Sequence, residues 1–207
     1  MSYIKKYDYV LLDHVIFLND FKEPIDWKNI FKNHNPIVLE IGCGNGHFLI
    51  NKSKQRPFFN YIGIDIKKKR IIRCREKELK YDIKNIKWIC DDAFLALTNL
   101  FENETISKIY MTFPDPWQKK KYHKNRLFKK EFVNLFHEKL STNGIFIFIT
   151  DFRDYFDESY ELVSNDKRFS LINNLFEIEP NLKDSLFGKK WENYSRNFYS
   201  FCIEKKY

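Results

Sequence analysis

Short apolar runs alternate along this chain with longer segments whose apolar residues recur at helical spacing. The runs predict strands at residues 37–41, 61–65, 86–90, 107–113 and 145–151. The intervening segments predict helices that open at residue 47 and cover residues 67–80, 93–101 and 127–140. Continuous apolar runs are typical of parallel strands buried on both faces. The alternation therefore predicts an α/β fold built on a mostly parallel sheet.

The two ends of the chain follow this pattern less clearly. Residues 9–12 predict a short strand, and Asp26 predicts the N-cap of a helix over residues 27–31. We expect residues 1–35 to form an N-terminal extension that acts as a lid, and residues 36–207 to form the core of a single domain, 1–207. Near the other end, residues 170–176 and 197–203 predict a final antiparallel pair.

Each of the five predicted strands ends in or is followed by an acid. The five are Glu40, Asp65, Asp92, Asp115 and Asp151. In an open parallel sheet the carboxyl ends of the strands lie along one edge, which is where ligands bind. Carboxylates gathered on one edge repel each other, so their recurrence favours a ligand site over a purely structural role.

A glycine turn, Gly-Cys-Gly-Asn-Gly at residues 42–46, joins the first predicted strand to its helix. Such a turn lets backbone N–H groups approach a ligand closely. Its Gly-x-Gly-x-Gly spacing differs from the Gly-x-Gly-x-x-Gly of dinucleotide binders. Glu40 is separated from this turn by Ile41 alone. A carboxylate in an apolar strand is costly to bury unless it meets a donor or a cation, and a ligand amine is a natural partner.

Two of the acids have structural alternatives. Asp65 follows the glycine turn by about 20 residues, as do carboxylates that bind ribose hydroxyls, but it is also placed to cap helix 67–80. Asp92 is placed to accept from an adenine amino group or to cap helix 93–101, and both roles can hold together.

The most distinctive segment is Thr-Phe-Pro-Asp-Pro-Trp at residues 112–117. Two prolines hold the backbone extended and stop the strand, so Asp115 stands on a stiff loop beside Trp117. Residues 119–130 follow with seven Lys or Arg and no acid. This arrangement predicts a catalytic carboxylate, a stacking residue and a phosphate-binding strip. The alternative is a proline-bounded turn before a solvated basic helix.

Composition narrows the class of protein. The chain has 207 residues, 43% of them hydrophobic, and a net charge of +8, which favours a polyanionic partner. It contains no apolar run of about 18 residues and no recognisable signal peptide, so we expect a cytoplasmic protein with no membrane partner. The cysteines at 43, 74, 90 and 202 form no Cys-x-x-Cys pair, and we expect neither a metal site nor a catalytic thiol at Cys43.

With these motifs, the chain resembles the tRNA (guanine-N7-)-methyltransferases, over roughly residues 36–203. The most specific resemblance is Phe-Pro-Asp-Pro-Trp at 113–117 with the Lys-Lys-Lys-Tyr-His-Lys-Asn-Arg-Leu that follows at 119–127. Glu-Ile-Gly-x-Gly at 40–44 is shared with many methyltransferases, and Thr150–Asp151 matches the family's acid after strand five. The family's Thr-x-x-Glu motif reads Lys-Lys-Trp-Glu at 189–192, so Glu192 fits while Lys189 replaces threonine.

The resemblance implies a Rossmann-like class I fold with a mostly parallel seven-stranded sheet and helices on both faces. It implies S-adenosyl-L-methionine as cofactor and tRNA as partner, with methyl transfer to N7 of a guanine in the variable loop. The implied cofactor contacts are Glu40, Gly42, Gly44, Asp65, Asp92 and Asp115, of which Asp115 is also catalytic. The implied substrate contacts are Lys119, Asp151 and Glu192. The implied RNA contacts are Lys121, Tyr122, His123, Lys124, Asn125 and Arg126.

Three other functions stay open at this point. The first is a methyltransferase of the same fold that acts on another RNA position or another substrate. The second is an RNA-binding subunit without cofactor affinity, and the third is a nicotinamide-dependent dehydrogenase. The intact glycines and acids argue against the second, and the glycine spacing argues against the third. Residues alone do not distinguish a monomer from a homodimer, or indicate whether a partner subunit is needed.

Overall fold

The computed structural model describes residues 14–173, 175, 179 and 197–207, which fall into two compact units, unit 1 (Met1–Glu102) and unit 2 (Asn103–Tyr207). The elements of unit 1 are β1 (Val15–Ile16), η1 (Leu18–Asp20), α2 (Trp27–Phe31), β2 (Ile37–Ile41), α3 (His47–Gln55), β3 (Asn60–Ile64), α4 (Lys68–Lys80), β4 (Ile86–Ile89) and α5 (Ala93–Leu100). Those of unit 2 are β5 (Ile106–Thr112), η2 (Lys120–Asn125), α6 (Lys130–Lys139), β6 (Leu140–Thr150), α7 (Arg153–Ser164), β7 (Phe169–Leu171) and β8 (Tyr199–Lys205).

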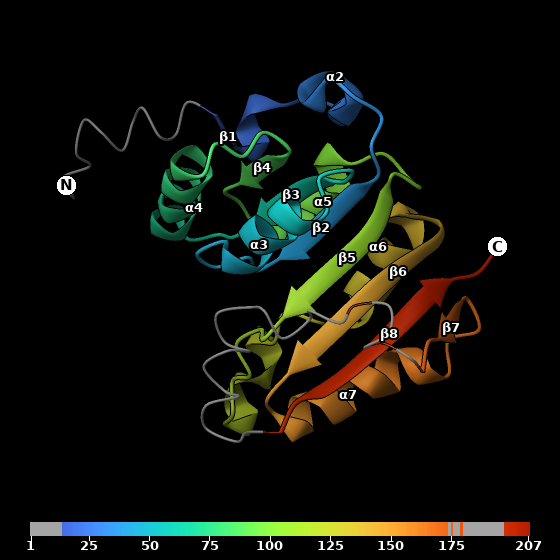
Figure 1. Ribbon diagram of the computed structural model, residues 1–207. Helices are drawn as coiled ribbons and strands as arrows, with labels where there is room; N and C mark the ends of the chain where they lie inside the picture. Colours follow the sequence, from blue (N-terminus) through green and yellow to red (C-terminus); the bar gives the residue numbers. More distant parts are fainter. Residues whose placement is uncertain (1–13, 174, 176–178, 180–196) are drawn as a thin grey trace. The chain divides into compact units, whose positions relative to one another are not determined.

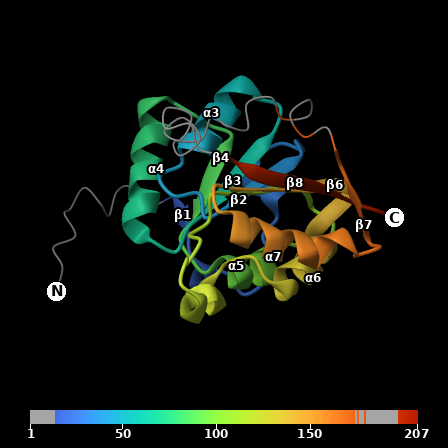
Figure 2. The same cartoon turned by 90° about the horizontal axis from the view of Figure 1, so that it is seen from below.

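In unit 1 the strands run in the order β1-β4-β3-β2, and each neighbouring pair is parallel (Figure 1). Ile41 is in register with Ile64, and Ile64 with Ile89, so β2, β3 and β4 end level with one another. Helices α3 and α4 lie on one face of these strands and α5 on the other (Figure 2). The three strand ends therefore share one edge of the unit.

In unit 2 the order is β5-β6-β8-β7, with β5 and β6 parallel and the other two pairs antiparallel. Helices α6 and α7 lie together on one face of these strands (Figure 2). Thr112 is in register with Ile149, so β5 and β6 also end level. The loops that follow them leave from the same edge of unit 2.

Most of the predicted elements are confirmed, including the antiparallel pair near the C-terminus and the helix that Asp26 caps through Asn29 N. The predicted helix over residues 127–140 begins later, at Lys130. Among the described residues there are eight strands, one more than the seven expected, because β1 adds a two-residue parallel edge beside β4. The strand predicted over residues 9–12 lies outside the described residues.

The described part of the N-terminal segment packs within unit 1. The Trp27 indole donates to Leu100 O and stacks on Phe101 with ring centroids 4.9 Å apart. Leu18 N donates to a carboxylate oxygen of Asp91 at 3.1 Å. A lid function for residues 1–35 and the single-domain organisation stay predictions.

The core of unit 1 closes around Trp88, which is fully buried. Its indole N–H donates to Glu78 at 2.7 Å, and Glu78 is also ion-paired with buried Arg75. Gly63, on the neighbouring strand, allows the indole to approach closely, since a Cβ there would lie 2.6 Å from the six-membered ring. This position is therefore occupied by glycine for steric reasons.

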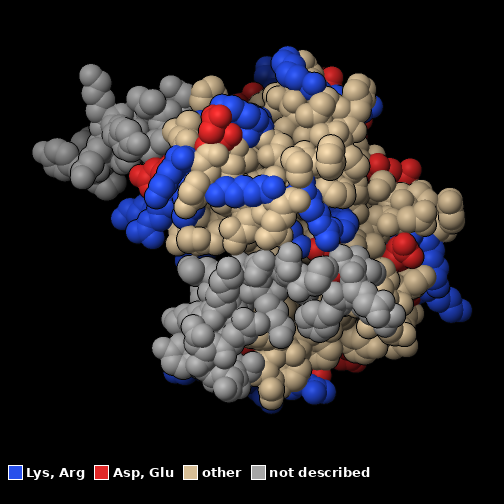
Figure 3. All heavy atoms as spheres, in the orientation of Figure 1, with Lys and Arg blue, Asp and Glu red and all other residues tan. Residues whose placement is uncertain are grey.

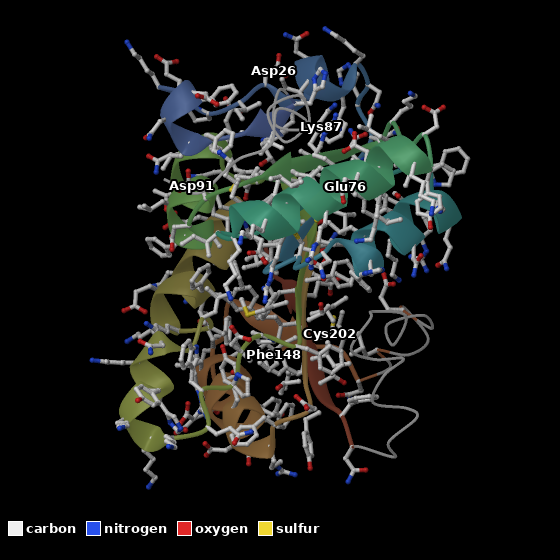
Figure 4. The ribbon with its side chains drawn as sticks, turned by 90° about the vertical axis from the view of Figure 1, so that its left-hand side faces the viewer. Asp26, Glu76, Lys87, Asp91, Phe148 and Cys202 are labelled. Carbon is white, nitrogen blue, oxygen red and sulfur yellow. The ribbon has the colours of Figure 1, made fainter. Side chains whose placement is uncertain are left out.

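The core of unit 2 is a cluster of aromatic rings, which accounts for much of the chain's Phe content. Phe146 on β6 packs against Phe136 of α6 at 4.6 Å and against Phe128 at 5.1 Å between ring centroids. Phe148 stacks on Phe201 of β8 at 5.2 Å. Figure 4 shows Phe148 with Cys202, which lies on the neighbouring strand β8. Ring pairs of this kind give a rigid base for the loops at the strand ends.

Within the described ranges, none of the helices has the length and apolar character needed to span a membrane.

We predict that Gly63→Ala destabilises the protein by about 1–3 kcal/mol, because the added methyl group overpacks the space beside Trp88. The free energy of unfolding in urea measures this effect. Trp88→Leu removes the aromatic rings that the methyl group would meet, so the same substitution should cost less in that background. An equal cost in both backgrounds would contradict the steric explanation.

Candidate functional site

The glycine turn at the end of β2 is tied to β3 by its backbone. The N–H groups of Gly42 and Cys43 both donate to Ile64 O at 2.9 Å. Gly44 has φ of +57°, a conformation that L side chains rarely adopt, and a Cβ there would meet nothing within 4 Å. The turn is thus a fixed backbone structure with open space beside it, as a ligand cradle requires.

Asp65 holds this turn in place from the end of β3. Its side chain is nearly buried, and it accepts from Gly44 N at 3.1 Å, Lys67 N at 2.8 Å and Arg70 at 3.2 Å. The N-cap residue of α4 is Lys67, so Asp65 does not cap that helix. A carboxylate offers about four lone-pair sites, so three donors leave it able to accept from a further hydroxyl group.

Two cations of α4 also contact this region. Lys77 donates to Asn45 O in the glycine turn at 2.7 Å, while Arg70 pairs with Asp65. Burial is the main cause that lowers the pKa of Lys77, and burial with the nearby Lys77 charge lowers the pKa of His47. Sequence reasoning did not identify this support of the turn. The only available signal was the Lys and Arg spacing along the helix.

The other two predicted site acids of unit 1, Glu40 and Asp92, lie at the same edge. Glu40 is 1% exposed in β2, in register with Gly63. Asp92 accepts from Phe94 N and Leu95 N, so its predicted helix-capping role is confirmed, and its cofactor role stays a prediction. Asp91 follows β4 (Figure 4) and accepts from Leu18 N and Asp92 N, a role that sequence reasoning did not identify.

The Phe-Pro-Asp-Pro-Trp segment leaves β5 in a strained loop. Phe113 has φ of +49° and Trp117 has φ of +45°, values that are unusual for bulky residues. Strain of this kind persists where surrounding contacts enforce it, and it clusters at functional sites. Phe113 N donates to Ile149 O at 2.8 Å and its ring meets Phe198 edge-on at 5.4 Å.

Asp115 stands at the exposed tip of this loop, between the two prolines. Asp151 directly follows β6 and is half-buried. Because β5 and β6 are parallel and end level, both acids belong to one edge of unit 2. Trp117 is 40% exposed and its ring lies 6.1 Å from that of Tyr122.

The basic strip after this loop divides into two groups. Residues 120–125 form the 3-10 helix η2, and the exposed members of the strip are Lys119, Lys120, Lys121, Tyr122, Lys124, Asn125, Lys129 and Lys130. His123 and Arg126 instead turn inward toward α7. Arg126 is only 2% exposed, which differs from the exposure that the expected RNA contact requires. Figure 3 shows a further group of Lys and Arg side chains over α4 in unit 1.

Among the described residues, His123, Asp154 and Glu158 have ligand atoms within 4.8 Å of one another, as in a metal site. The Arg126 guanidinium donates to both of these carboxylates, so a cation of the protein already occupies their shared side. Glu192, expected to contact substrate, and the neighbouring Lys189 lie outside the described residues.

Comparisons with known proteins match this architecture. Residues 34–201 match the family model described as Putative methyltransferase. A tRNA (guanine-N(7)-)-methyltransferase of Streptococcus pneumoniae (strain Hungary19A-6) is 40% identical over 149 residues, covering 72% of this chain and 69% of its own length. The enzyme of that name from Actinobacillus pleuropneumoniae serotype 5b (strain L20) is 38% identical over 140 residues, or 68% of this chain.

Among solved structures, Haemonchus contortus phosphoethanolamine N-methyltransferase 2, in complex with S-adenosyl-L-methionine, aligns with a TM-score of 0.54 and 13% identity over 97% of this chain and 56% of that chain. The order of strands and helices, together with this likeness, shows that the protein has the class I S-adenosylmethionine-dependent methyltransferase fold. The chain belongs to the tRNA (guanine-N(7)-)-methyltransferase family. It spans 56% of the length of the Actinobacillus relative.

We predict that the Cys43 thiol reacts slowly in the native protein. Burial, followed by the neighbouring Cys74 thiol, raises the pKa of Cys43 well above its usual range, which reduces the reactive thiolate. Alkylation at pH 8, located by peptide mass spectrometry, should be roughly tenfold or more slower in buffer than in urea. Equal rates in both solvents would show a reactive thiol and contradict the expectation that Cys43 is not a catalytic thiol.

Proposed function

We propose that this chain transfers a methyl group from S-adenosyl-L-methionine to N7 of a guanine in the variable loop of tRNA. The observation that carries the proposal is the strained Phe-Pro-Asp-Pro-Trp loop, which presents an exposed carboxylate and an exposed indole directly before a lysine-rich 3-10 helix. The names of the relatives and the S-adenosyl-L-methionine bound in a neighbour of the same fold support it.

The edge of unit 1 fits the cofactor by its donor set. The open space beside Gly44 leaves room against the turn's backbone, and Asp65 retains acceptor capacity for ribose hydroxyl groups. In the proposal Glu40, Gly42, Gly44, Asp65, Asp92 and Asp115 bind the cofactor. When bound, S-adenosyl-L-methionine supplies an electrophilic methyl group on a positively charged sulfur.

The proposed reaction requires no proton transfer to or from the protein at the reacting nitrogen. Guanine N7 has an in-plane lone pair and no proton, so no general base is needed to remove one. The lone pair forms the new N–C bond as the S–C bond breaks, and the electron pair of that bond stays on sulfur. Positioning in line should therefore supply most of the rate.

Carboxylates have two tasks in this proposal. The methylated guanine is cationic, so a carboxylate nearby stabilises positive charge that grows in the transition state. The guanine Watson–Crick edge carries N–H donors that a carboxylate binds. Asp115 and Asp151 are assigned to these tasks, with Lys119 and Glu192 as further substrate contacts and Trp117 as a stacking platform.

The exposed lysines of the strip are assigned to tRNA phosphates. Lys119, Lys120, Lys121 and Lys124 present ammonium groups to solvent without a carboxylate among the neighbouring residues 116–130. Binding through such contacts depends strongly on salt because it releases counterions.

We predict that the purified protein, given total tRNA and methyl-labelled S-adenosyl-L-methionine, produces labelled 7-methylguanosine on nucleoside analysis. Asp115→Ala should reduce this product by about 100-fold or more, because it removes charge stabilisation and a cofactor contact. The variant's thermal unfolding should match the wild type, since Asp115 is exposed. Label in another nucleoside would assign a different substrate, and wild-type turnover in Asp115→Ala would remove that residue from the mechanism.

We predict that replacing Lys119, Lys120 and Lys121 together by Gln weakens tRNA binding and lowers the slope of log K against log salt by about 2. Titrations of labelled tRNA at several salt concentrations measure the slope. The matched control replaces the exposed Lys22, Lys28 and Lys32 by Gln, which removes the same charge outside the strip. Equal slopes for both triple variants would place the phosphate contacts elsewhere.

A further inference from the structure

Arg126 belongs to the basic strip, yet its guanidinium lies inside unit 2. The side chain is 2% exposed, whereas Lys124, two residues earlier, is exposed to solvent. A phosphate group reaches a lysine on the surface without disturbing the protein. It reaches Arg126 only if the contacts around the guanidinium are broken.

Those contacts occupy the guanidinium from several sides. Nε donates to Pro116 O at 2.9 Å, one terminal nitrogen donates to Asp154 at 2.9 Å, and the other pairs with Glu158. The guanidinium carbon also lies 4.8 Å from the centre of the Tyr155 ring, in a cation–π contact. The planar fork of arginine suits such multiple contacts better than an ammonium group does.

The contact with Pro116 reaches the loop that carries Asp115. Pro114 and Pro116 have no backbone N–H, so this loop lacks the donors with which a turn usually holds its own shape. Trp117, the next residue, has φ of +45° and needs an external constraint to keep that conformation. The Arg126 Nε supplies a donor to the carbonyl between Asp115 and Trp117 in the chain.

The other end of the contact network is a rigid element. Asp154 and Glu158 lie one turn apart on α7. Tyr155 lies between them, and its hydroxyl oxygen accepts from Phe128 N at 2.8 Å. His123 Nδ1 lies 3.0 Å from Glu158 and adds a second contact from η2 to the same helix. Arg126 therefore connects the strained loop after β5 to the helix after β6.

We propose that Arg126 is a positioning residue, which holds Asp115 and Trp117 in the geometry needed for methyl transfer, and that it is not an RNA contact. This inference rests on the proposed function for its catalytic readout. It assigns different roles to neighbouring basic residues of one motif: exposed lysines for tRNA phosphates and a buried arginine for the loop.

The test is Arg126→Lys, which keeps the charge but removes the fork that bonds Pro116 and α7 together. At saturating tRNA and cofactor, kcat should fall about 10- to 100-fold, because misplacement of reacting groups by about 1 Å costs that much. The salt slope of tRNA binding should equal that of the wild type. Arg168→Lys is the matched control, since Arg168 is a partly exposed residue paired with Asp166, and it should leave kcat unchanged.

Three further experiments make the result specific. Lys124→Gln should lower the slope of log K against log salt by about 1, the change expected for the loss of one phosphate contact. This variant tests whether the assay detects such a loss. Hydrogen exchange should quicken at the amides of residues 115 and 117 in Arg126→Lys and stay unchanged in β5 and β6. Glu158→Gln weakens the same network from α7, so it should also lower kcat and quicken exchange at residues 115 and 117. This second variant tests the proposal if Arg126→Lys does not fold.

The outcomes separate the two proposals. Wild-type protein that makes no 7-methylguanosine contradicts the proposed function, and the exchange measurements still test Arg126. An active wild type with unchanged kcat and unchanged exchange in the folded variants overturns the positioning role. A salt slope lowered by Arg126→Lys as much as by Lys124→Gln overturns it as well, and restores Arg126 as an RNA contact.

Discussion

Burying a charged side chain is unfavourable unless hydrogen-bonding partners surround it, and in both units the partners that meet this requirement also shape a loop. In unit 1 the buried Asp65 carboxylate accepts from Gly44 N in the glycine turn. In unit 2 the buried Arg126 guanidinium donates to Pro116 O in the Phe-Pro-Asp-Pro-Trp loop. The two charges have opposite signs, but each compensates its burial by fixing a backbone segment to which we assign ligand binding.

The exposed and the buried basic groups of one motif therefore have different surroundings. Ammonium groups such as that of Lys124 remain solvated, where they can follow an irregular line of phosphates. Arg126, with its planar fork, serves inside the protein. In the same way, Lys77 supports the glycine turn through Asn45 O, while Lys67, Lys68 and Lys69 of that basic region are exposed. A run of like charges therefore contains residues with different tasks.

Local rules predicted the strand–turn–helix order well because they depend on near neighbours in the chain. The apolar run of β2, the glycine turn and the capping carboxylate of Asp92 all belong to this class. The helix predicted from residue 127 begins only at Lys130, because the backbone of Lys129 is extended, with φ of −142° and ψ of 170°, and Lys129 is the N-cap. The two-residue strand β1 is too short for any periodicity, and its pairing with β4 defines it.

By itself the sequence determined which residue types stand at the strand ends and which segment is strongly basic, since periodicity, glycine and proline act locally. Only the tertiary structure decided which of those charges face solvent and which hold a loop. Arg126 meets Glu158 across 32 positions of the chain, and Gly44 meets Asp65 across 21. Contacts at such separations depend on how strands and helices pack, and a pattern of neighbouring residues does not contain that information.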